Sequence, residues 1–147
     1  MTEISAVDAL KIQARAVGPI VRVLEERMGK EEAHKLVRDA IAGAWADHVE
    51  KSFSKNETPQ NAKMPFNNDW IIAKDTSSEY SYKMVKCDAA EYFRSIGEEE
   101  VGALLSCGVD YEVEKRRLPD WTFSRTQTLM MGADHCNFCY RRRSNDH

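Results

Sequence analysis

The chain has 147 residues, of which 42% are hydrophobic and 31% are charged, and its formal net charge is -3. This length suits a single domain, 1–147, and the composition excludes wholesale disorder, which goes with few apolar groups and a large net charge. The slight acidic excess argues against a nucleic-acid-binding protein, because such proteins usually carry a strong excess of Lys and Arg.

Helix-forming residues dominate the first third of the chain, 1–53. A first helical stripe begins beside Pro19, a residue suited to the first turn of a helix, and ends at Gly29. Residues 30–51 form the longest predicted helix, because their apolar side chains recur at intervals of three and four. The apolar stripe of this helix consists of Ala33, Leu36, Val37, Ala40, Ile41, Ala44, Trp45, His48 and Val49. The small residues beside Trp45 let helices approach closely, so a second subunit could bind there and form a homodimer.

The composition changes after this helix. Residues 54–68 are rich in Asn, Pro, Lys and Thr, and they predict a connecting loop. The apolar period then becomes two, because Tyr80, Tyr82 and Met84 alternate with other residues as in a strand with one more polar face. Short helices are predicted from Asp88 to the residues before Gly97, over 98–107 and over 110–116.

Two further strands are predicted near the carboxy terminus. Residues 121–129 alternate and are rich in Thr and aromatic side chains, which favour strands. A turn at 132–134 leads to a strand that starts at 136–140, and the two strands should pair as a hairpin. The whole pattern predicts an α+β fold, in which a helical amino-terminal part packs on a small antiparallel sheet with short helices. The sheet-and-helix part, 69–143, carries the candidate site.

Three cysteines and an aspartate are the candidate catalytic residues and metal ligands. Cys87, Cys107 and Cys136 are far apart in sequence, so only the folded chain can bring them together, and Asp110 follows Cys107 by one helical turn. The four groups could hold zinc or an iron–sulfur cluster with one open position. Alternatively, one thiolate is a nucleophile and Asp110 steers protons. In the third interpretation each cysteine is a small buried apolar residue.

The remaining polar candidates lie in the last two predicted strands. An arginine inside a strand needs an anion, so Arg125 could orient a substrate carboxylate or pair with an acid such as Asp110 or Glu112. Thr126 and Thr128 share one face of the strand and are candidate substrate-binding residues. Cys139 completes a C-x-x-C motif with Cys136, but residues three apart on a strand point to opposite faces, so we expect Cys139 to be incidental.

The sequence carries neither a membrane-spanning run nor a secretory signal. No apolar stretch approaches the ~20 residues of a membrane helix. The amino terminus has no basic start followed by an apolar stretch. The four cysteines are therefore typical of reduced thiols, and we expect a cytoplasmic protein that acts on a small molecule, without membrane or nucleic-acid partners.

Several of these motifs occur together in a known family. Four motifs follow one another in order: Cys87, the Cys107-Gly-Val-Asp110 segment, the Arg-Thr-Gln-Thr segment starting at Arg125, and the Cys136-Asn137-Phe138 segment after a glycine turn. Together they resemble the L-2-amino-thiazoline-4-carboxylic acid hydrolase family. The resemblance covers roughly residues 80–142. In the family the last segment is Cys-Asp-Phe, so Asn137 departs from the pattern. If the family Asp transfers protons, this chain acts on a different substrate or by a variant mechanism.

The resemblance implies hydrolysis of a cyclic C–N bond in an amidine-like ring, such as the opening of 2-aminothiazoline-4-carboxylate toward a carbamoyl-cysteine. Cys107, Cys136 and Cys87 with Asp110 would then supply the activated water or thiolate and the proton donor, directly or through a metal. Arg125 would bind the carboxylate. Two other classes remain open: a metal- or small-molecule-binding module that uses the same cysteines, and a scaffold that dimerises through its first third.

Overall fold

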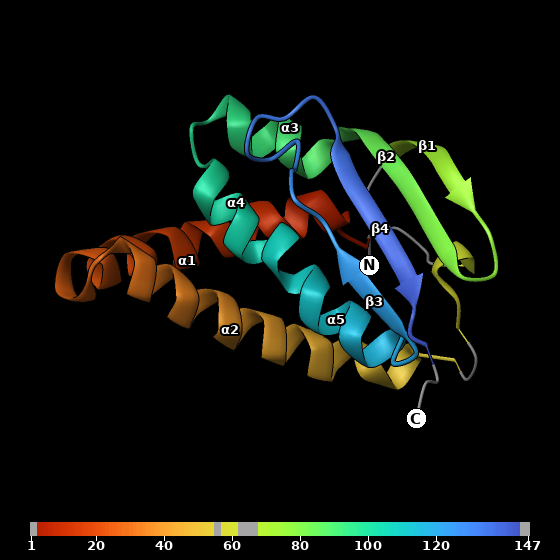
Figure 1. The fold of residues 1–147 in the computed structure, drawn as a ribbon. Coiled ribbons are helices and arrows are strands. Elements are labelled where there is room, and N and C mark those ends of the chain that lie inside the picture. Colours follow the sequence, from red (N-terminus) through yellow and green to blue (C-terminus); the bar gives the residue numbers. More distant parts are fainter. Residues whose placement is uncertain (1–2, 55–56, 62–67, 145–147) are drawn as a thin grey trace.

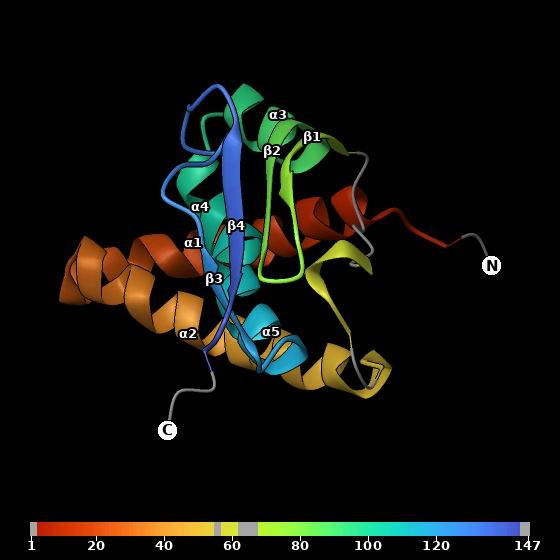
Figure 2. The ribbon, with the colours of Figure 1, turned by 45° about the vertical axis from the view of Figure 1, so that its right-hand side comes forward.

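The computed structural model describes residues 3–54, 57–61 and 68–144. Two long helices form one layer, three short helices form the next, and a four-stranded antiparallel sheet covers the short helices (Figures 1 and 2). This arrangement confirms the predicted α+β fold. The short helices lie between the long helices and the sheet, so residues that join short helices to strands lie near the centre of the molecule.

The first layer is a hairpin of α1 (Ala6–Met28) and α2 (Lys30–Val49), which are separated by Gly29 at a φ of 88°. The predicted helix start at Pro19 is wrong, because α1 begins at Ala6, where the Ser5 hydroxyl accepts a hydrogen bond from the Asp8 N–H. Pro19 is tolerated inside α1 because this side of the helix faces solvent, where water can satisfy the carbonyl that lacks a partner. Within the described residues, neither of these helices nor any other is long and apolar enough to span a membrane.

The apolar stripe of α2 is only partly buried. Ala33 and Val37 face α1 and α4 (Glu99–Leu105), whereas Leu36 is 51% exposed and Trp45 is 45% exposed. His48 is also exposed. The helix lies at the edge of the molecule, so half of a wide stripe faces solvent. The predicted homodimer at this stripe stays a prediction.

The sheet has the strand order β1-β2-β4-β3 and is antiparallel throughout. Its strands are β1 (Asn68–Asp75), β2 (Glu79–Cys87), β3 (Trp121–Ser124) and β4 (Cys136–Arg142). The alternation in β2 is confirmed, since Tyr80, Tyr82 and Met84 are all buried. β1 was not predicted, because it is an exposed edge strand whose residues show no alternation. The predicted loop, 54–68, lies partly outside the described residues.

The hairpin of β3 and β4 is confirmed, but the strand predicted over 121–129 is too long. β3 ends at Ser124, and residues 125–135 form a loop. The cause lies in β4, where the Asn137 side-chain oxygen accepts hydrogen bonds from the backbone N–H groups of Thr126 (2.9 Å) and Gln127 (3.0 Å). These bonds replace the ladder bonds that a continuing strand would make.

The middle layer consists of α3 (Asp88–Ser95), α4, a 3-10 turn η3 (Cys107–Val109) and α5 (Asp110–Arg117), close to the predicted ranges. Gly102 on α4 is in close contact with its neighbours. A Cβ there would lie 2.6 Å from Phe93 Cγ and 2.7 Å from Met130 Sδ. This contact holds α3 and the 125–135 loop against α4, next to Cys107.

Candidate active site

The predicted cysteines lie on segments that border the junction of the sheet and the middle layer. Cys87 ends β2 and packs against both the sheet core and the core formed by α1, α3 and α4. Cys136 begins β4 and belongs to the sheet core, whereas Cys107 begins η3 and packs against the helical core. All four cysteines are free thiols. Cys139 lies on the opposite face of β4 from buried Cys136, in agreement with the prediction.

Arg125 and Asp110 form an ion pair at this place. Arg125 Nη1 donates to Asp110 Oδ2 at 2.6 Å, and Arg125 Nη2 donates to the Cys107 carbonyl oxygen at 2.7 Å. The Arg125 side chain is 3% exposed and that of Asp110 is 40% exposed. Of the two roles predicted for Arg125, the structure therefore contains the ion pair with an acidic residue. This ion pair fixes η3 relative to the end of β3.

Aromatic rings surround the Arg125 guanidinium. Its central carbon lies 4.9 Å from the ring centre of Phe138 and 5.5 Å from those of Phe123 and Tyr111. The Tyr111 hydroxyl also donates to the Arg125 carbonyl oxygen at 2.8 Å. Buried Arg125 Nε has no hydrogen-bond partner in the described part of the chain. The guanidinium is thus held in place, and one of its buried donors has no hydrogen-bond partner among the described residues.

The surroundings keep the thiols protonated. Burial raises the pKa of Cys107 to about 12, although the charge of Arg125 opposes the shift. Burial also raises the pKa values of Cys87 and Cys136. The pKa of Asp110 is raised as well, because desolvation outweighs the charge of Arg125. Near neutral pH the site therefore presents neutral thiols beside a carboxylate with increased proton affinity.

The cysteine cluster does not have the geometry of a single-ion shell in this structure. Zinc holds sulfur and oxygen ligands at about 2.0–2.3 Å, so its ligand atoms lie roughly 3–4 Å from one another. No three of the ligand atoms of Cys87, Cys107, Cys136 and Asp110, all of them in the described residues, lie within 4.8 Å of one another. The zinc and iron–sulfur hypotheses stay predictions, and the chemistry proposed below uses the protein's own groups.

The sequence matches the family described as L-2-amino-thiazoline-4-carboxylic acid hydrolase over residues 10–140. The chain belongs to this family. The match extends beyond the motifs of the carboxy-terminal half and includes most of α1 and all of α2.

Several solved structures resemble the fold of this hydrolase-family chain. One of them is the crystal structure of the phenol-responsive sensory domain of the transcription activator PoxR with phenol. The TM-score is 0.52 at 11% sequence identity, and the alignment covers 86% of this chain and 73% of that one. At this identity the likeness concerns the fold alone. Comparison with curated proteins found no significant match.

The position at which this chain departs from the family pattern has a structural role. Besides accepting two backbone hydrogen bonds, Asn137 donates through Nδ2 to Thr126 Oγ1 at 2.6 Å. Thr128 Oγ1 accepts from the Met131 N–H at 3.2 Å. An Asp at position 137 could accept the same two backbone bonds, so Asn137 keeps the loop-fixing function. The substrate-binding roles of Thr126 and Thr128 stay predictions.

Two cavities border α5, and their lining includes sequence neighbours of the site residues but not Arg125, Asp110 or a cysteine. A cavity of about 510 Å³ between α2 and α5 is lined by residues that include Gly108 and Tyr111, the neighbours of Cys107 and Asp110. A second cavity of about 320 Å³ lies between α5 and the sheet and is lined in part by Tyr111 and Phe123. Sequence reasoning missed Tyr111, whose only signal was its position next to Asp110.

Proposed function

We propose that this chain is a hydrolase that opens a cyclic amidine-like C–N bond in a small carboxylate-bearing heterocycle such as 2-aminothiazoline-4-carboxylate. Membership of a family named for that hydrolase supports the reaction class. The observation that carries the proposal is the contact of Asp110 with buried Arg125 beside Cys107. In the proposed reaction Asp110 is the proton-transfer group, Arg125 is the cation, and Cys107 contributes a neighbouring thiol.

Asp110 is the group best suited to move protons. A raised pKa lets a carboxylate accept a proton in one step and return it in the next. In the proposed reaction a water oxygen bonds to the amidine carbon and its proton passes to Asp110. The ring C–N bond then breaks as the added hydroxyl oxygen becomes the carbonyl oxygen of the product. Asp110 returns its proton to the leaving nitrogen, and the hydroxyl proton passes to the same nitrogen, which leaves as the amine. Each turnover consumes one water and restores Asp110.

The cysteines have two candidate roles in this scheme. If Cys107 were the nucleophile, its thiol would first transfer its proton to Asp110 and its sulfur would bond to the ring carbon. The pKa of Cys107, about 12, makes that transfer costly. We therefore favour attack by water, with the neutral thiols of Cys107 and Cys136 in contact with the ring.

Arg125 is proposed to orient the substrate carboxylate. Two of its nitrogens bind Asp110 and Cys107, whereas its buried Nε has no partner among the described residues. A carboxylate bound at Nε would complete the hydrogen bonding of the guanidinium and would lie beside the proton-transfer group. Binding at a rigid, aromatic-enclosed cation would also fix the ring orientation.

A second candidate function is a binding module that recognises a small molecule without converting it. The protonated state of Cys107 favours this candidate, because a buried neutral thiol is a poor nucleophile. The shared fold with a phenol-responsive sensory domain is compatible with it. The cytoplasmic location stays a prediction under either function.

Turnover of 2-aminothiazoline-4-carboxylate, followed by nuclear magnetic resonance, tests the hydrolase proposal. The wild-type protein should open the ring, and Asp110→Asn should slow it by about 100-fold or more, the usual contribution of a general acid–base group. Asp134→Asn is the matched control, since the Asp134 side chain is 89% exposed and pairs with His135. Binding without turnover by the wild-type protein would favour the binding module, and equal rates for the two variants would remove Asp110 from the mechanism.

A further inference from the structure

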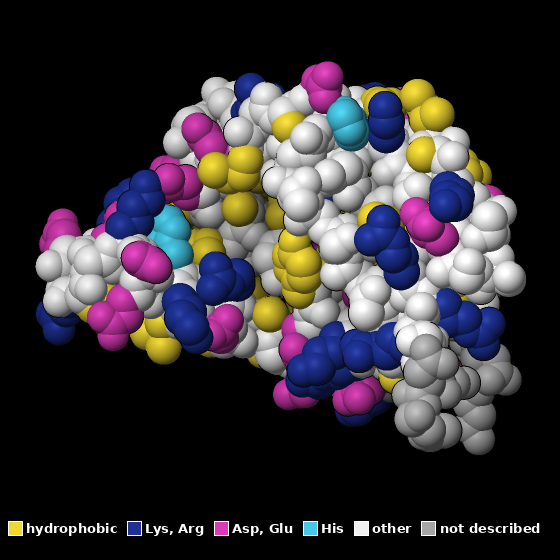
Figure 3. Space-filling model, in the orientation of Figure 1, with side chains coloured by type: hydrophobic (Ala, Val, Ile, Leu, Met, Phe, Trp, Pro, Cys, Tyr) yellow, Lys and Arg dark blue, Asp and Glu magenta, His cyan; other side chains and the backbone are white. Residues whose placement is uncertain are grey.

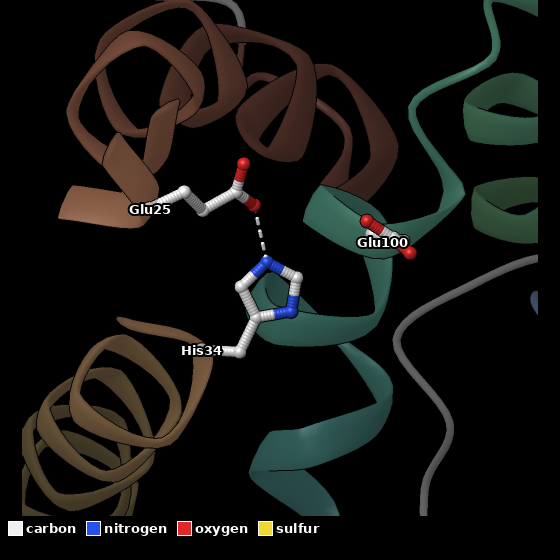
Figure 4. Close-up of side chains that lie close together, drawn as sticks. All are labelled: Glu25, His34 and Glu100. Atoms are coloured by element: carbon white, nitrogen blue, oxygen red, sulfur yellow. Dashed lines mark hydrogen bonds and ion pairs between the residues drawn. The ribbon is translucent and has the colours of Figure 1, made fainter. Parts of the chain in front are cut away.

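A second cluster of metal-ligating side chains lies at the far end of the helical layer, away from the cysteines. The cluster consists of Glu25 on α1, His34 on α2 and Glu100 on α4. Figure 4 shows His34 hydrogen-bonded to Glu25, with Glu100 on the neighbouring helix. One ligand atom from each lies within 4.8 Å of the other two. We propose that these residues form a divalent-cation site that fastens α4 to the α1–α2 hairpin.

The chemistry of the three ligands fits a first-row divalent ion. One imidazole and two carboxylates are donors that zinc and manganese accept. Ligand atoms around an ion at about 2.0–2.2 Å are roughly 3–3.5 Å apart. His34 Nε2 and Glu25 Oε1 lie 2.5 Å apart in a hydrogen bond, so a bound cation would replace this bond and separate the two atoms slightly. The third ligand atom, from Glu100, lies within 4.8 Å of both. The Glu100 side chain is 45% exposed and can rotate without disturbing the core.

The surroundings of the cluster are rich in carboxylates. A cavity of about 230 Å³ is lined by Glu25, His34 and Glu100 and also by Glu98 and Glu99. Glu99 Oε2 is buried and has no hydrogen-bond partner among the described residues. A carboxylate oxygen without a partner needs a donor or a cation, because burying it alone is costly.

Two basic side chains offset part of this negative charge. Arg22 forms an ion pair with Glu98, and Lys30 Nζ lies 2.5 Å from Glu100 Oε1. Four carboxylates therefore face two cations, and the Lys30 side chain is 61% exposed. Acidic and basic side chains are interspersed over this part of the surface (Figure 3). A bound cation would displace Lys30 from Glu100, so Lys30 and the ion compete for the same carboxylate.

This competition separates the cation site from a simple network of ion pairs. If the cluster binds a cation, Lys30→Ala should strengthen binding, because Glu100 then has no competing partner. If the cluster consists only of ion pairs, Lys30→Ala removes one pair and produces no cation affinity. The site lies on residues that the proposed hydrolase does not use, so either proposal can fail without the other.

Titration with Mn²⁺ alone, followed by the loss of its free-ion electron paramagnetic resonance signal, tests the proposal. Mn²⁺ prefers carboxylate and imidazole to thiolate, so the cysteines do not compete for it. The wild-type chain should bind one ion. His34→Gln and Glu100→Gln should each weaken binding at least about tenfold, because each removes one of three ligands. His48→Gln, on an exposed position of the same helix as His34, should leave the affinity unchanged.

Thermal unfolding provides a second readout of the same site. A cation that joins three helices binds the folded chain only, so Mn²⁺ should raise the Tm of the wild-type chain and not that of Glu100→Gln. Since Glu100 is at the surface, this variant should fold, as circular dichroism will verify. Absence of Mn²⁺ binding by the wild-type chain, or equal affinity in His34→Gln and His48→Gln, would overturn the proposal.

Discussion

Removal of the Arg125 side chain should destabilise the fold far more than removal of a partly exposed arginine. The side chain is 3% exposed, and it holds both the Asp110 carboxylate and the Cys107 carbonyl oxygen. Breaking a buried ion pair by removing one partner costs about 3–5 kcal/mol. Because the Asp110 side chain is 40% exposed, water can partly replace the lost contact, so we expect about 3 kcal/mol for Arg125→Ala.

The matched control is Arg116→Ala. Arg116 also pairs with acidic residues, Asp47 and Glu112, but its partners are 72% and 34% exposed. Exposed pairs contribute about 0–1 kcal/mol, so this variant should lose less than about 1 kcal/mol. Urea unfolding at neutral pH, followed by circular dichroism, gives both free energies of unfolding. A loss in Arg125→Ala no larger than that in Arg116→Ala would refute the structural importance of the buried pair.

Two further predictions concern the neighbourhood of the site. Gly102→Ala should lower the free energy of unfolding by about 1–3 kcal/mol through overpacking. By contrast Gly43→Ala, with nothing within 4 Å of its added Cβ, should raise the free energy of unfolding by up to about 1 kcal/mol through helix propensity. Urea unfolding of both variants checks this pair, and a change of the same sign in both would contradict the prediction. The folded chain retains the Cys107 proton up to a pKa of about 12 and the unfolded chain loses it near 9.0, so stability falls as pH rises between these values. At pH 10 this group should account for about 1.4 kcal/mol of the loss. In unfolding measured against pH, Cys107→Ala should abolish this contribution and Cys139→Ala should retain it.

The sequence predicted those elements whose local pattern matches their burial. Tyr80, Tyr82 and Met84 alternate because one face of β2 covers the core, and Gly29 ends α1 at a positive φ. The start of α1 was missed because a helix tolerates an internal proline such as Pro19 only where that side of the helix is exposed, and exposure is a tertiary property. β1 was missed because an exposed edge strand has no buried face to impose alternation.

Part of the candidate site could also be predicted. The spacing of Cys107 and Asp110 and the need of a strand arginine for an anion identified the residues that meet in the structure. The end of β3 could not be predicted, because Asn137 on a different strand takes the backbone bonds of the 125–135 loop. The Glu25, His34 and Glu100 cluster joins three helices and has no sequence motif.

Turnover in water labelled with oxygen-18 tests the central claim most directly. Hydrolysis of 2-aminothiazoline-4-carboxylate must place one solvent oxygen in the opened product, which mass spectrometry detects. We predict one label per product molecule, a rate that falls strongly in Asp110→Asn, and an unchanged rate in the Asp134→Asn control. Recovery of the heterocycle unopened and unlabelled from a wild-type chain that binds it would contradict the hydrolase account.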